Sequence, residues 1–106
     1  MVRTIDQRIT EYIEDINKLL GVKYAYIFGS YVREDYDPYN SDIDIAVFSE
    51  AINSRNKHSF VRKGLRLISK YKMNFEPFFF NLSDYAERDN DFIQKEIKQK
   101  GHKIWG

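Results

Sequence analysis

Two aspartates, Asp42 and Asp44, interrupt a short apolar segment of this chain. They alternate with three apolar residues, Ile43, Ile45 and Val47, so in an extended strand the two carboxylates share one face. A carboxylate on a half-buried strand must be paired, hydrated or bound to a metal ion. Two such groups close together repel each other, and a divalent cation removes that repulsion. Because magnesium and manganese prefer oxygen ligands, the pair predicts a site for one of these ions, although Asp-x-Asp alone also occurs at solvent-facing strand ends.

A second motif, Gly29-Ser30, lies just upstream and follows the apolar segment 23–28. Glycine lets a polyanion approach the backbone, and the free N–H groups at a helix start can bind phosphates together with a serine hydroxyl. Taken alone, the pair fits an ordinary helix-capping turn better than a phosphate site. Its place before the two aspartates is what favours a nucleotide site.

The elements that position these residues follow from the spacing of the apolar residues and from the turn residues. In chain order the sequence predicts a helix over 5–20 with Gly21 as its C-cap, a strand over 23–28, a turn or short helix from 29, a strand over 42–47, a helix over 51–71, a strand over 74–81 and a helix over 84–100. Pro77 predicts that the third strand lies at an edge of the sheet or carries a bulge. A small sheet covered by helices follows.

Length and composition limit the classes of function. The 106 residues predict one domain, residues 1–106, and 17 basic against 16 acidic residues give a net charge of +1. No global field then draws the protein to nucleic acid or to a membrane, and direct nucleic-acid binding is not expected. The absence of cysteine excludes disulfides, thiolate metal sites and a cysteine nucleophile. Without a signal peptide or a membrane-spanning run, we expect a soluble cytoplasmic protein.

One stretch departs from this even balance of charge. Seven basic residues lie between Arg55 and Lys72, and no acidic residue occurs from Ala51 to Phe75. A solvated helix face explains the stretch better than a site for a triphosphate, RNA or an acidic partner, and all of these interpretations stay open.

The motifs together resemble a known pattern. The segments YIFGSYVRED and NSDIDIAVF are similar to the signature of the DNA polymerase beta-like nucleotidyltransferase superfamily, in which an apolar strand ends in Gly-Ser and a loop leads to Ser-Asp-hydrophobic-Asp-hydrophobic. FEPFFF and the closing IQKEIKQKGHKIWG are similar to its minimal nucleotidyltransferase (MNT) branch, whose members are often paired with HEPN toxins. The resemblance covers most of the chain and implies an α+β fold in which helices cover a small mixed sheet.

The resemblance also implies roles for individual residues. The implied metal ligands, which are also the implied catalytic residues, are Asp42, Asp44 and Glu76. The implied nucleotide contacts are Gly29, Ser30 and Arg33. The implied cofactor is Mg²⁺ or Mn²⁺ and the implied substrate is ATP. Glu76 takes the place of the family's third carboxylate, on a later strand than the aspartates.

Two functions of different class follow from the resemblance. The first is a metal-dependent nucleotidyltransferase that transfers AMP from ATP to a hydroxyl group, that of a tyrosine in a HEPN toxin, and thereby acts as an antitoxin. The alternative is a non-catalytic antitoxin of the same fold that neutralises its partner by stoichiometric binding. Clustered carboxylates favour the enzyme, because a pure binder has no reason to keep like charges together. Both a homo-oligomer and a hetero-oligomer are compatible with the sequence.

Overall fold

The computed structural model describes residues 5–106, so the expected domain, residues 1–106, is described from its fifth residue onward. In chain order its elements are α1 (Gln7–Leu20), β1 (Tyr24–Phe28), η1 (Gly29–Val32), β2 (Ile43–Ser49), α2 (Lys57–Ile68), β3 (Phe75–Asn81), α3 (Leu82–Tyr85), η2 (Phe92–Gln99) and β4 (His102–Trp105). η1 is a 3-10 helix and η2 is a π-helix.

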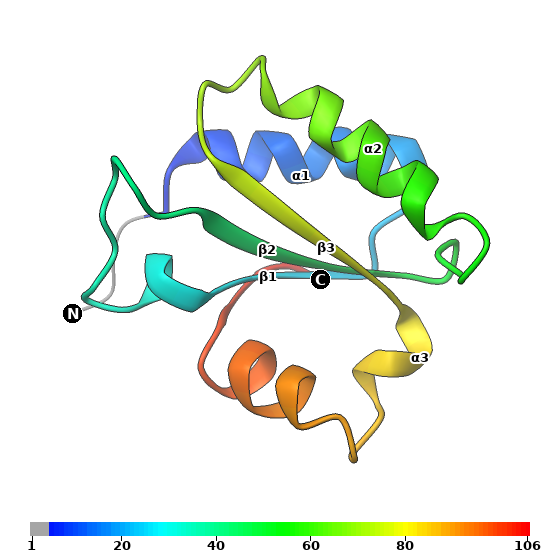
Figure 1. Cartoon of the computed structure of the whole chain (residues 1–106). Helices are drawn as coiled ribbons and strands as arrows, with labels where there is room; N and C mark the ends of the chain where they lie inside the picture. Colours follow the sequence, from blue (N-terminus) through cyan, green and yellow to red (C-terminus); the bar gives the residue numbers. More distant parts are fainter. Residues whose placement is uncertain (1–4) are drawn as a thin grey trace.

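The strands form one mixed sheet in the order β3-β2-β1-β4. β1 is antiparallel to both of its neighbours, β2 and β4, whereas β2 and β3 run parallel. A parallel pair needs a crossover connection, and α2 supplies it. Figure 1 shows α1 and α2 on one face of the sheet, with α3 and the orange helix η2 on the other. The predicted α+β fold, a small mixed sheet covered by helices, is confirmed.

α1 illustrates how local sequence sets an element. Asp6 precedes the helix, and its side chain accepts a hydrogen bond from the backbone N–H of Arg8 at 2.9 Å. At the other end Gly21 adopts a φ of 76° and donates its N–H to the carbonyl of Asn17 at 2.8 Å. The face toward the sheet carries four fully buried residues: Ile9, Tyr12, Ile13 and Ile16. The predicted helix and its glycine cap are confirmed.

Each face of the sheet has its own core. The larger core lies under α1 and α2 and takes alternate residues of the strands, including Ile27, Ile43, Ile45 and Phe79. The smaller core lies under α3 and η2 and consists of Tyr26, Phe28, Ala46, Phe48, Ile93 and Ile97. Because side chains alternate along a strand, Asp44 and Glu76 belong to the η2 face.

Two predictions about the C-terminal part are wrong. The single helix predicted over 84–100 is replaced by two separate helices, α3 and η2. Residues His102–Trp105 form a fourth strand, β4, which the sequence did not predict. The break is stabilised by side chains, since the carbonyl of Tyr85 accepts hydrogen bonds from Gln94 Nε2 at 3.2 Å and from Lys98 Nζ at 3.0 Å. β4 is held by its pairing with β1 and by a hydrogen bond from Trp105 Nε1 to the carbonyl of Val22 at 3.1 Å.

The remaining boundaries differ less from the prediction. Pro77 lies on β3, an edge strand, where its missing N–H costs no ladder hydrogen bond. α2 begins at Lys57 rather than at residue 51, because the side chains of Asn53 and Asn56 bond to backbone groups and form a turn before it. All seven basic side chains between residues 55 and 72 are exposed.

Candidate active site

The site is built on one row of residues across three strands. Phe28 of β1 lies opposite Asp44 of β2, and Asp44 lies beside Glu76 of β3 in the parallel ladder. Residues directly opposite each other point to the same face of a sheet, so the two carboxylates are neighbours. Asp44 is half-buried and Glu76 is exposed. The structure thus brings Asp44 and Glu76 together, as the sequence predicts.

Gly29 lies directly against this pair. Its φ is 76°, and a Cβ built on it would stand 2.5 Å from Asp44 Oδ2. Both observations require glycine, since other residues rarely adopt this backbone conformation and any side chain would meet the carboxylate. The space that the missing side chain leaves is therefore filled by Asp44, whereas the sequence suggested that phosphate would use it.

The electrostatics of Asp44 are unusual for a surface carboxyl group. Burial is the largest cause that raises its pKa, followed by the charge of Glu76 and, more weakly, that of Asp42, and together they bring it to about 6. Arg33 acts in the opposite direction but more weakly. Burial and the neighbouring negative charges together favour the protonated form of Asp44, and a bound cation would offset the part that is due to those charges.

Asp42 lies just before β2 and is exposed. Within residues 5–106, no three acidic or histidine side chains are gathered closely enough to hold a metal ion. The donors nevertheless fit a magnesium or manganese ion, because all three are hard carboxylate oxygens and the raised pKa of Asp44 marks the position where a cation would replace a proton. Their assignment as ligands stays a prediction.

Ser30 and Arg33 both follow Gly29 in the chain. Both belong to the turn that η1 makes, in which the N–H of Arg33 donates to the carbonyl of Ser30 at 3.0 Å. The Arg33 guanidinium pairs with Asp35 at 3.1 Å, and this pairing, followed more weakly by the charges of Glu96 and Asp44, raises its pKa. η1 has only four residues, so it offers a single turn and no extended helix dipole for a phosphate. The nucleotide contacts of Gly29, Ser30 and Arg33 stay predictions.

The helix η2, whose position the sequence did not predict, borders this site. Phe92, the first residue of η2, packs its ring against Phe28 with centroids 5.6 Å apart, and the Phe28 ring also contacts Phe78 at 5.2 Å. A continuous helix was predicted here, so the position of Phe92 beside the strand ends did not follow from the sequence. The polar run 87–91 directly before Phe92 is the one signal in the sequence that could have indicated a break of the helix at this point.

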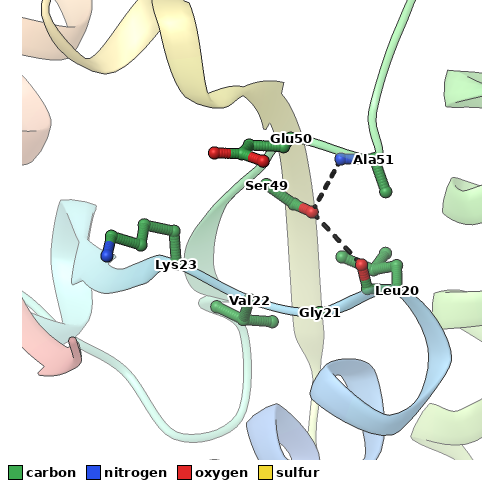
Figure 2. Close-up of a pocket in the computed structure, with 7 residues that line it drawn as sticks. All are labelled: Leu20, Gly21, Val22, Lys23, Ser49, Glu50 and Ala51. Carbon is green, nitrogen blue, oxygen red and sulfur yellow. Dashed lines mark hydrogen bonds between the residues drawn. The ribbon is translucent and has the colours of Figure 1, made fainter.

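Three hollows on the described part of the surface are lined by residues other than the predicted site residues. A pocket of about 420 Å³ is lined by Leu20–Lys23, which lead from α1 into β1, and by Ser49–Ala51 at the end of β2. Figure 2 shows these residues. Because Gly29 follows β1 and Asp44 is the second residue of β2, this pocket lies at the opposite end of the two strands. The Ser49 hydroxyl is satisfied within it, since it donates to the Leu20 carbonyl and accepts from the Ala51 N–H. Two further hollows, of about 190 and 460 Å³, are lined by residues of the α1 start, the loop before β2 and the segment before β3.

Comparison with known proteins gives the class. Residues 8–104 match the family described as "Nucleotidyltransferase domain", so the fold is that of this family and its general activity is the transfer of nucleotidyl groups. The chain belongs to this family, whose members generally use a nucleoside triphosphate and a divalent metal ion. No curated protein and no solved structure matches the chain. Within residues 5–106, no helix has both the length and the apolar character needed to cross a membrane.

Proposed function

We propose that the protein transfers AMP from ATP to a hydroxyl group of a partner protein. The hydroxyl oxygen bonds to the α-phosphorus, pyrophosphate leaves with the bridging oxygen, and the hydroxyl proton passes to solvent. The observation that carries the proposal is the placement of Asp44 and Glu76 side by side against the Gly29 backbone, on neighbouring parallel strands. Phosphoryl and nucleotidyl transfer require positioning and charge neutralisation more than covalent chemistry by the protein, and this cluster of carboxylates suits that task.

The residues take distinct roles in this proposal. Asp42, Asp44 and Glu76 would hold the magnesium or manganese ion, which when bound neutralises charge on the triphosphate and makes the acceptor hydroxyl easier to ionise. Asp44 must be ionised to act as a ligand, and its pKa of about 6 allows this at neutral pH. Because Gly29 has no side chain, the Asp44 carboxylate can lie close to the end of β1. The Ser30 hydroxyl and the Arg33 guanidinium would bind the phosphates of ATP.

The acceptor belongs to the same proposal. The resemblance to MNT proteins supports a HEPN toxin as the partner and one of its tyrosines as the modified group, so that the protein acts as an antitoxin. A tyrosine hydroxyl suits a metal-assisted reaction, because its ordinary pKa of about 10 makes it easier to ionise than serine.

The test is to incubate the protein and its HEPN partner with magnesium and ATP and to weigh the partner by intact mass spectrometry. We expect AMP-sized increments with the wild-type protein, none with Asp44→Asn, and an unchanged result with Asp89→Asn. Asp89 is a matched control because it is an exposed aspartate in the turn between α3 and η2.

A second candidate function has a distinct outcome in the same experiment. If the partner is fully inhibited while its mass is unchanged, the protein is a stoichiometric antitoxin. If the partner is neither modified nor inhibited, the proposed partnership is wrong.

A further inference from the structure

Phe92 is exposed although it is a large apolar residue. Its exposed fraction is 39%, whereas Phe28, against which it packs, is only 5% exposed. It begins η2, a π-helix, and π-helical segments are rare and are found frequently at functional sites.

The position of the ring relative to the carboxylates follows from the strand register. Phe28, Asp44 and Glu76 form one row on the η2 face of the sheet, and Phe78 follows Glu76 by two residues on that same face. Phe92 packs on Phe28, and Phe28 packs on Phe78, so the three rings form an aromatic cluster on the face of the sheet that carries the two carboxylates, and Phe92 is its exposed member.

The geometry of the ring contact leaves part of Phe92 available. The Phe28 and Phe92 planes meet at 80°, an edge-to-face arrangement. In such an arrangement Phe28 can cover at most one face of the Phe92 ring. The opposite face of the ring is not covered by Phe28, and this agrees with the exposure of the residue.

A second observation places η2 against the same strand. Ile93 and Ile97 of η2 are fully buried in the core that contains Phe28. η2 is therefore packed on the face of the sheet to which Asp44 and Glu76 belong.

We propose that Phe92 stacks on the base of the nucleotide whose phosphates are bound beside Asp44 and Glu76. The inference rests on the proposed function and adds a binding site for the nucleobase. A phenyl ring offers no hydrogen-bond donors or acceptors, so it binds every base through its flat surface and prefers purines for their larger area. Stacking on Phe92 thus gives affinity for the base with little discrimination among bases.

The experiment measures two ligands by calorimetry in the presence of magnesium: ATP, and inorganic tripolyphosphate, which lacks the base. The variants are Phe92→Leu, which keeps apolar packing on Phe28 but has no aromatic face, and Phe92→Tyr, which keeps that face. We expect Phe92→Leu to weaken ATP binding by about 5- to 150-fold and to leave tripolyphosphate binding unchanged. Phe92→Tyr should bind ATP as the wild-type protein does.

The control is Leu65→Ala. Leu65 is another exposed large apolar residue, 49% exposed, and it lies on α2, on the other face of the sheet. Its substitution should change neither affinity. Circular dichroism and thermal melting report whether each variant is folded.

The outcomes separate the two proposals. If the wild-type protein binds neither ligand, the proposed nucleotidyltransferase function fails. If it binds both and folded Phe92→Leu binds ATP with wild-type affinity, the function stands and the stacking role of Phe92 is wrong. Equal losses for ATP and tripolyphosphate would also overturn the inference, because the ring would then support the site as a whole and not the base.

Discussion

Replacement of Gly29 by alanine tests the closest contact of the candidate site. The added methyl group would stand 2.5 Å from Asp44 Oδ2, and the residue would have to keep a φ of 76°. The positive φ alone costs an L-residue about 1 to 2 kcal/mol. Displacing a packed neighbour adds roughly 1 to 3 kcal/mol. We therefore expect Gly29→Ala to lower the free energy of unfolding by about 2 to 5 kcal/mol.

The chain contains a matched control for this substitution. Gly21 has the same φ of 76°, but a Cβ built on it would meet nothing within 4 Å. Gly21→Ala should therefore show the backbone cost alone. The difference between the two variants measures the contact with Asp44.

Urea denaturation followed by circular dichroism, in chelator, gives the free energies of unfolding. Adding Asp44→Ala to Gly29→Ala removes the obstructing carboxylate, so the double variant should be less destabilised than the sum of the single changes. Equal losses in Gly29→Ala and Gly21→Ala, together with additivity in the double variant, would refute the idea that Asp44 occupies the space beside Gly29.

Three further substitutions test other parts of the structure. In metal-free protein, Asp44→Asn should raise the free energy of unfolding by about 1 kcal/mol above pH 6, after reduction for solvent screening. The raised pKa of Asp44 favours its protonated form in the folded state, so this gain in stability should vanish below about pH 4, where the carboxyl group is protonated in both states. Because the variant lacks one proposed ligand, manganese should stabilise it less than the wild-type protein. Tyr12→Phe should cost about 1 kcal/mol in urea denaturation, since the buried hydroxyl donates to the Gly64 carbonyl at 2.8 Å, and an unchanged midpoint would contradict that role. Gly101→Ala should lower the melting temperature by at least about 8 °C, because its Cβ would collide with the Ile97 carbonyl, and a wild-type melting curve would contradict this.

Much of the fold could be predicted because its signals are local. The α1 helix has apolar residues at helical spacing and a glycine at its end, and β2 begins with isoleucines on either side of Asp44 and continues with apolar residues. The pairing of Asp44 with Glu76 was also within reach, since the resemblance placed a third carboxylate on a later strand and the register confirms that the two are neighbours.

The errors arise where long-range contacts decide the structure. β4 has four residues, too few to show alternation, and it exists because β1 offers a free edge. The break before η2 depends on Gln94 and Lys98 reaching back to the Tyr85 carbonyl, which no residue pattern displays. The closeness of Gly29 to the Asp44 carboxylate is likewise visible only in three dimensions.

The exposed basic residues beside and on α2 give the molecule a strongly uneven charge. Seven of the 17 basic residues lie between 51 and 75, where no acidic residue occurs, so the rest of the chain holds ten basic and 16 acidic residues. The net charge of +1 is therefore the sum of +7 on residues 51–75 and −6 on the rest of the chain. At low ionic strength such a molecule has a large electric dipole moment, and neighbouring molecules attract each other head to tail. At about 0.15 M salt the Debye length falls to roughly 8 Å and suppresses this attraction. Its solubility should therefore rise with added salt, and an ion-exchange resin of either sign should retain it at neutral pH.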